Sequence, residues 1–188
     1  MCLGDACADE DPIVVDLSGA GFLLTNAQNG VKFDFFGTGK PLQMAWTQRN
    51  ASVGFLALSR ESDGLIEDGA DLFGNLTSQP AGPGQNGYKA LAIFDNPANG
   101  GNGDGQITSA DAVWPRLRIW VDANHDGVSQ PSELLTLDQA GVRAISLSYT
   151  ESRWTDAYGN KFRYRGEITW SKPVNGKTNA VIYDVLLH

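Results

Sequence analysis

Residues 122–133, DANHDGVSQPSE, carry oxygen-bearing side chains at nearly alternate positions, a central glycine and a terminal glutamate. Calcium takes about six to eight oxygen ligands, and a 12-residue loop supplies them from positions 1, 3, 5, 7, 9 and 12. Gly127 fits the sharp turn needed at position 6. An ordinary polar turn is the alternative, but it does not require the terminal glutamate. We predict calcium ligands at Asp122, Asn124, Asp126, Val128 (through its carbonyl), Gln130 and Glu133.

A second copy of this pattern lies upstream, in DNPANGGNGDGQITSAD. Alignment on Gly105 leaves Gly100 in the register of position 1, so Asp95 has to reach in across an insertion. An aspartate at position 12 has a shorter reach than a glutamate, which predicts weaker binding. The candidate ligands are Asp95, Asn102, Asp104, Gln106 and Asp111, and Thr108 occupies position 9.

A third and weaker copy runs from Ser59 to Asp71. Serine is a poor first ligand, and the last acid stands one residue late. Its candidate ligands are Glu61, Asp63, Glu67 and Asp71. Two shorter stretches with a similar Asp/Gly pattern begin at Asp16 and Asp34. They retain too few carboxylates to bind calcium, so we predict turns there. Altogether the sequence predicts two or three calcium ions.

The charge balance agrees with a protein that collects cations. The 188-residue chain carries a formal charge of −8, which argues against a nucleic-acid partner because such binding depends on Lys and Arg. Crowded carboxylates repel one another, so we expect calcium to stabilise the fold. No apolar run reaches the roughly 18–20 residues of a membrane span.

We predict a flexible leader over residues 1–11 and one calcium-binding domain over residues 12–188. Cys2 and Cys7 both lie in the leader, where a small disulfide and two free thiols are equally open readings. The only histidines are His125, inside the loop 122–133, and the terminal His188. A Ser-His-Asp or Cys-His catalytic site is therefore not predicted.

Short apolar or alternating runs from Pro12 to residue 59 predict strands. Helices are predicted over YKALAIFD, after the capping box Thr108–Asp111, and over PSELLTLDQAG, whereas KFRYRGEITW and NAVIYDVLLH predict a hairpin. The predicted fold class is α+β, with mainly antiparallel strands and short helices built around EF-hand-like calcium loops.

The motifs DPIVVDLSGAG, NGVKFDFFGTG, GFLALSRESDGLIEDGADLFG and NGDGQITSADAVWPRLRIWVDANHDGVSQPSELLTL occur in an order that resembles a known family. It is that of calcium-binding modules from large exported bacterial RTX-type proteins, which includes the self-processing module of iron-regulated RTX proteins. The likeness spans about residues 11–150. The tail from Ser152 onward resembles a branch of uncharacterised exported bacterial proteins with the same loops.

The resemblance implies a secreted or cell-surface module, as part of a larger exported chain, and places candidate chemistry at Asp11–Pro12. In the self-processing branch, calcium-dependent folding triggers cleavage of an Asp-Pro bond, and the resulting anhydride can crosslink to a lysine. Asp9 and Glu10 stand beside Asp11 and are expected to raise its pKa by like-charge repulsion. Calcium binding that orders the fold is the leading function, and self-cleavage is the alternative, so enzymatic activity stays open.

Overall fold

The computed structural model describes residues 11–188. Cys2, Cys7, Asp9, Glu10 and the rest of the predicted leader before Asp11 lie outside the described residues. The strands are β1 (Ile13–Asp16), β2 (Val31–Phe33), β3 (Leu42–Met44), β4 (Val53–Ala57), β5 (Gln106–Ile107), β6 (Arg118–Trp120), β7 (Leu134–Thr136), β8 (Val142–Ser146), β9 (Thr150–Thr155), β10 (Lys161–Val174) and β11 (Lys177–Leu186).

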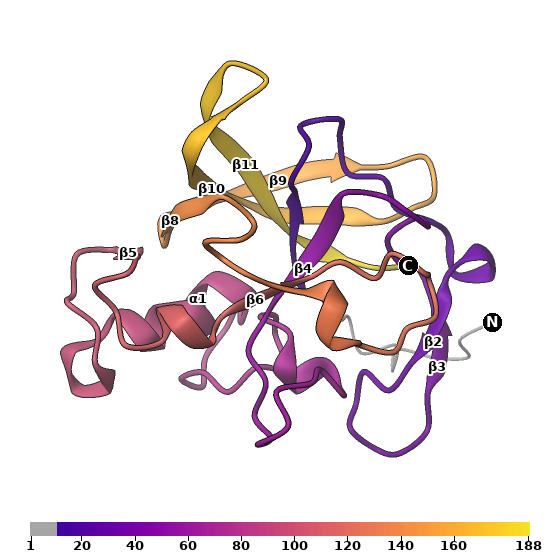
Figure 1. Ribbon diagram of the computed structural model, residues 1–188. Coiled ribbons are helices and arrows are strands. Elements are labelled where there is room, and N and C mark those ends of the chain that lie inside the picture. Colours follow the sequence, from indigo (N-terminus) through magenta and orange to yellow (C-terminus); the bar gives the residue numbers. More distant parts are fainter. Residues whose placement is uncertain (1–10) are drawn as a thin grey trace.

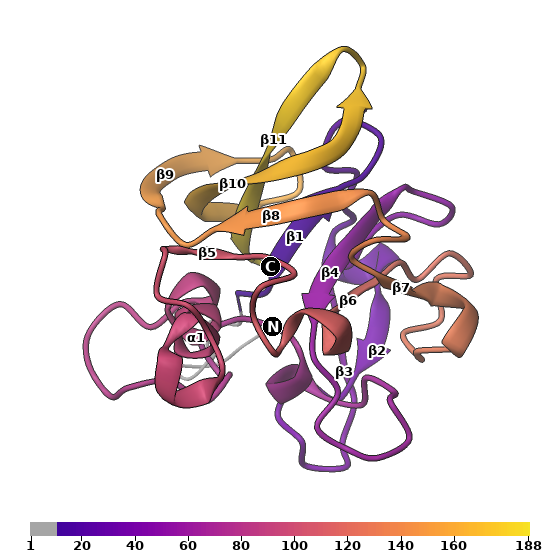
Figure 2. The same ribbon diagram turned by 60° about the vertical axis from the view of Figure 1, so that its left-hand side comes forward.

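A nine-stranded antiparallel sheet organises the described chain. Its order is β5-β8-β10-β11-β1-β4-β6-β7, and β9 pairs with the first residues of β10, 161–165. The strands turn progressively along this order, so that the sheet curls into a half-barrel (Figures 1 and 2). β2 and β3 form a separate two-stranded sheet. Because β1 lies between β11 and β4, the segment that begins at Asp11 enters the centre of the large sheet.

The central strands are apolar on both faces, because each face of the sheet is covered. Along β1, Ile13 and Val15 belong to one hydrophobic core, whereas Val14 belongs to the other. Alternate residues of a strand point to opposite faces, so continuous apolar runs are expected where both faces are buried. Helix α1 (Gly87–Ala92) packs into the first core, and the β2–β3 sheet packs into the second.

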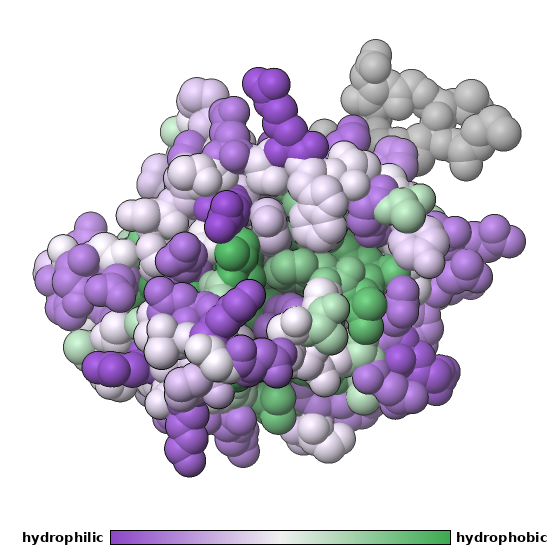
Figure 3. Space-filling model, turned by 90° about the horizontal axis from the view of Figure 1, so that it is seen from above, coloured by the Kyte–Doolittle hydropathy of each residue, from purple (hydrophilic) through white to green (hydrophobic). Residues whose placement is uncertain are grey.

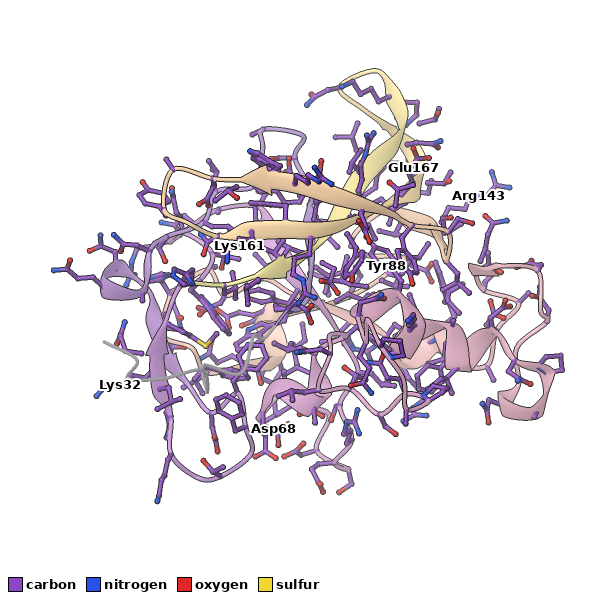
Figure 4. All side chains as sticks on the ribbon, turned by 180° about the vertical axis from the view of Figure 1, so that it is seen from behind. Lys32, Asp68, Tyr88, Arg143, Lys161 and Glu167 are labelled. Atoms are coloured by element: carbon purple, nitrogen blue, oxygen red, sulfur yellow. The ribbon has the colours of Figure 1, made fainter. Side chains whose placement is uncertain are left out.

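Tyr88 of α1 anchors the helix to the sheet. It is fully buried, donates a hydrogen bond from its Oη to the Ile182 carbonyl at 2.9 Å, and stacks on Tyr149. Figure 4 shows the Tyr88 side chain between the helix and the long strands.

On the face seen from above, apolar side chains gather in the middle and polar ones surround them (Figure 3). In the described chain, no helix is both long and apolar enough to cross a membrane.

The α+β prediction was wrong. α1 is the only α-helix among the described residues, and the other helical pieces are short 3-10 turns. They are η1 (Ala27–Asn29), η2 (Gly69–Asp71), η3 (Ile93–Asp95), η4 (Pro97–Asn99), η5 (Trp114–Arg116) and η6 (Pro131–Glu133). The fold is mostly antiparallel β, so its acidic loops are not flanked by EF-hand helices.

Local features explain where the helix predictions failed and where they held. Pro115 interrupts the stretch after Thr108, which forms turns and η5. After Glu133 the chain continues as β7, because Leu134, Leu135 and Thr136 pair with β6. The helix over YKALAIFD is confirmed as α1 and η3, and the predicted terminal hairpin is confirmed as β10 and β11.

Candidate functional site

Asp11 lies inside the fold, at the entrance to β1, and is 0% exposed. Its Oδ1 accepts a hydrogen bond from the Asn75 backbone N–H at 2.8 Å. Its Oδ2 forms an ion pair with Arg163 Nη1 on β10 at 2.7 Å. The carboxylate beside the Asp11–Pro12 bond is thus held from two sides.

The backbone on both sides of Pro12 is fixed as well. The Pro12 carbonyl accepts from the Val185 N–H at 3.0 Å, and the Ile13 N–H donates to the Phe73 carbonyl at 2.8 Å. Gly74 packs directly on the peptide: a Cβ at this position would stand 2.8 Å from the Asp11 carbonyl oxygen. The Asp11–Pro12 bond is therefore clamped between β11 and the segment 73–75.

A second buried acid, Asp184 of β11, faces Asp11. Asp184 is 0% exposed, and its Oδ2 accepts from the Gly87 N–H at 2.8 Å. The side chains of Asp11 and Asp184 lie close enough for a proton to be shared between them. Asp184 Oδ1 has no donor among the described groups while both acids are ionised. A proton on this oxygen would satisfy both carboxyl groups, since a protonated carboxyl becomes a donor.

The environment separates the protonation states of the two acids. Burial raises the pKa of Asp11 to about 6, and the hydrogen bond from Asp184 and the charge of Arg163 limit the rise. Burial, together with the negative charge of Asp11, raises the pKa of Asp184 well above its usual range. Asp11 is therefore mostly ionised near neutral pH, and the environment of Asp184 favours its protonated form. The pKa of Asp11 is raised, as expected. Within the described chain the main cause is burial, whereas the expected cause was repulsion from the neighbouring acids.

The loop 122–133 forms a closed turn around its first acid. Asp122 is buried, and its Oδ2 accepts from the Gly127 N–H at 2.9 Å and from Trp46 Nε1 at 2.8 Å. Glu133, at the other end, accepts from the Ala123 N–H at 3.0 Å. The amides of the loop therefore orient both terminal carboxylates.

The loop 95–111 repeats this arrangement in spite of its insertion. Asp95 Oδ2 accepts from the Gly105 N–H at 2.9 Å, as Asp122 accepts from the corresponding Gly127. Asp111 Oδ1 accepts from the Asn102 N–H at 3.2 Å. Asp95 thus reaches the first position of the loop although Gly100 holds that register in the sequence.

In the loop 59–71, Asp71 closes the turn by accepting from the N–H groups of Arg60 and Glu67. Asp63 accepts from the Leu65 N–H at 3.0 Å, the same contact that Asp126 makes with Val128. Ser59 supplies no carboxylate at the first position. The Glu61 carbonyl accepts a hydrogen bond from Ser59 Oγ.

The two shorter stretches share the same turn. Asp16 Oδ2 accepts from the Gly21 N–H at 2.7 Å, and Asp34 Oδ2 accepts from the Gly39 N–H at 2.5 Å. In both, Ser, Ala, Phe or Thr stands where further acids would be needed. They are turns of the predicted kind.

The donor set at 122–133 fits a calcium ion. Asn124 and Gln130 both direct their side-chain amides at Asp126 Oδ2, at 2.9 and 3.0 Å, so loop positions 3, 5 and 9 converge. Each of these amides also carries an oxygen, and hard oxygen ligands are what calcium takes. No three Asp, Glu, His or Cys side chains within residues 11–188 are already gathered as a metal cluster.

Two of these loops lead directly into the groups around Asp11. The Asp11 peptide and carboxylate contact Gly74 and Asn75, which follow Asp71 by three and four residues. α1, whose Gly87 N–H binds Asp184, runs through η3 to Asp95. The positions of the loops 59–71 and 95–111 therefore affect the geometry of the pair of buried acids, Asp11 and Asp184 (the carboxyl pair).

Sequence reasoning missed Asp184, Arg163, Gly74 and Asn75. One signal was available: Asp184 is the single acid in the apolar run AVIYDVLL. It shares a strand face with Ile182, which belongs to the core beneath α1. A buried ionisable group on a core face is a candidate for a functional role.

The fold and the site define an antiparallel β domain with acidic turns and a buried Asp-Pro junction. The family model of the SPM domain matches residues 13–187, so the chain belongs to the SPM domain family. The match begins directly after Asp11–Pro12.

Among curated proteins, the chain is similar to the iron-regulated protein FrpA of Neisseria meningitidis serogroup C, at 35% identity over 175 residues. The aligned region covers 92% of this chain and 15% of FrpA, so the chain spans less than a sixth of that relative's length. This similarity supports the branch of iron-regulated RTX proteins that the motifs predicted. Calcium binding stays a prediction.

Proposed function

We propose that this chain is a self-processing module that cleaves its own Asp11–Pro12 bond. The observation that carries this proposal is the clamped and buried Asp11, whose side chain is fixed beside its own peptide bond. A flexible leader would sample that geometry rarely. When a fold holds the reacting groups in the right orientation, the activation free energy can fall by about 7–11 kcal/mol.

The reaction needs no residue beyond Asp11 as nucleophile. One carboxylate oxygen of Asp11 attacks its own carbonyl carbon and closes a five-membered anhydride. The C–N bond to Pro12 breaks, and the proline nitrogen leaves as a secondary amine after it gains a proton. Water then opens the anhydride, or a lysine amine captures it as an isopeptide. The ionised state of Asp11 near neutral pH suits the attacking role.

Calcium would act on this site through the loops. Bound in the loops, the ion would supply neutralising charge for their crowded carboxylates. In the loop 122–133, the residues that would hold it are Asp122, Asn124, Asp126, Val128, Gln130 and Glu133. Ordering of the loops 59–71 and 95–111 would keep Gly74, Asn75 and Gly87 on the carboxyl pair. Calcium that only stabilises the module, without cleavage, is the second candidate function, and the same loop geometry favours it.

The decisive experiment is the fate of the Asp11–Pro12 bond. The metal-free chain is incubated with calcium near neutral pH, and its mass is followed. We expect release of residues 1–11 and a new amino terminus at Pro12, with no cleavage by Asp11→Ala. Asp138→Ala, at an exposed aspartate, is the matched control and should cleave normally. An intact chain with calcium bound would leave the stabilising module as the function.

A separate prediction concerns the loop 122–133. Glu133→Gln is expected to weaken calcium binding about tenfold or more, because a charged ligand becomes neutral. Titration calorimetry in the Asp11→Ala background measures this on an uncleaved chain. Glu167→Gln, at an exposed glutamate of β10, should bind as the parent does. Equal affinities for all three chains would contradict a ligand role for Glu133.

The similarity to FrpA also supports a proposal on context. We infer that the module belongs to a larger exported bacterial RTX-type protein and works outside the cell or on its surface. Extracellular calcium modules bind with Kd values of about 10⁻⁴–10⁻³ M, so such a module would fold and cleave after export.

A further inference from the structure

We propose that Asp184 is the general acid that protonates the Pro12 nitrogen when the Asp11–Pro12 bond breaks. This inference rests on the proposed self-cleavage and assigns a catalytic residue to it. Three observations carry it: the burial of Asp184, its contact with the Asp11 carboxyl group, and its position in the strand that binds Pro12.

The register of the sheet brings Asp184 to the reacting atoms. Asp184 is the Cα partner of Ile13, and the N–H of the next residue, Val185, binds the Pro12 carbonyl at 3.0 Å. The Asp184 side chain lies beside that of Asp11, the nucleophile, and the two carboxyl groups interact electrostatically. Its side chain therefore lies beside the reacting carboxyl group, and the backbone N–H of the next residue, Val185, holds the leaving proline.

The contacts of Asp184 also determine where its proton resides. Oδ2 accepts from the Gly87 N–H, whereas Oδ1 has no donor among the described residues. A proton on Oδ1 removes the repulsion between the two carboxyl groups and turns an unsatisfied contact into a hydrogen bond. The charged and titratable groups that face Asp184 are Asp11, Arg163 on β10 and Tyr88 on α1. Arg163 binds Asp11 directly at 2.7 Å and favours ionisation of that partner.

The proton balance of the step closes on these two acids. Before the reaction Asp11 is a carboxylate and Asp184 a carboxylic acid. Attack by Asp11 forms the anhydride C–O bond, and the C–N bond breaks as the proton of Asp184 passes to the proline nitrogen. Afterwards Asp184 is a carboxylate, Pro12 carries a secondary amine, and no further reactant is consumed. A positioned proton donor contributes about 10²–10⁴-fold in rate.

Asp184→Asn tests this role with little change of shape. The amide can still accept from Gly87 and donate to Asp11, but it has no proton to transfer. With calcium held at saturation, we expect the cleavage rate to fall about a hundredfold or more. Asp138→Asn, the same substitution at an exposed aspartate, should leave the rate unchanged.

The pH profile separates a proton donor from a structural residue. The wild-type rate should rise through about pH 6 as Asp11 ionises and fall at alkaline pH as Asp184 loses its proton. Asp184→Asn should keep the rise and lose the alkaline fall. Wild-type cleavage with no alkaline fall, or an Asp184→Asn rate equal to wild type, would overturn this role and leave self-cleavage standing. If Asp184→Asn does not fold, the wild-type alkaline limb decides alone. No cleavage by the wild type would refute the proposed function itself.

Discussion

Gly74→Ala is expected to slow cleavage of the Asp11–Pro12 bond about a hundredfold or more while calcium binding persists. A Cβ at residue 74 would stand 2.8 Å from the Asp11 oxygen, 3.1 Å from the Asp11 carbonyl carbon and 3.4 Å from Pro12 Cα. These are backbone atoms of the reacting peptide, so they cannot rotate away as a flexible side chain would. A misplacement of about 1 Å at a reacting centre can cost a factor on the order of 10² in rate.

The measurement is the first-order rate of mass loss at saturating calcium. Gly82→Ala is the matched control, because nothing lies within 4 Å of a Cβ at that position. Overpacking costs about 1–3 kcal/mol, so a thermal melt is needed to show that the Gly74→Ala chain is still folded. A folded Gly74→Ala chain that cleaves as fast as Gly82→Ala would show that the clamp on the peptide is irrelevant to the reaction.

The acidic loops could be predicted from the sequence because their information is local. Spacing within twelve residues predicted a calcium loop at 122–133. The structure shows a closed turn there, calcium binding stays a prediction, and Asp95 reaches the first position of the second loop across the insertion. The helix predicted over PSELLTLDQAG was wrong because local sequence signals do not show which segments pair as strands. Here pairing with β6 makes Leu134–Thr136 a strand.

The carboxyl pair could not be predicted because its members are far apart in the sequence. Asp11, Asn75 and Arg163 meet only through the order of the sheet, and 152 positions separate Asp11 from Arg163. The Asp-Pro dipeptide pointed to the reaction, but nothing local indicated what would bury Asp11 or donate a proton. The lone acid in the last strand was the available signal, and only the register of β11 against β1 gives it a partner.

Arg163→Met is expected to reduce the cleavage rate about tenfold at pH 7 and to shift the rising limb of the pH profile to higher pH. Burial raises the pKa of Asp11 to about 6, and the positive charge of Arg163 opposes that rise. Removal of the charge leaves burial less opposed, so the pKa of Asp11 rises further and less of it is ionised at pH 7. An opposite charge at about 4–6 Å or closer commonly has an effect of this size or larger on a carboxyl group.

The sign of the shift distinguishes this role from a loss of packing. A chain that has merely become less stable would cleave more slowly at every pH, whereas Arg163→Met should approach the wild-type rate as the pH rises and Asp11 ionises. Arg165→Met, at an exposed arginine two residues along β10, is the control for loss of a positive charge and should keep the limb near pH 6. Arg163→Lys restores a cation and should return the limb toward wild type. A rising limb at the same pH in Arg163→Met and wild type would mean that another group governs the ionisation of Asp11.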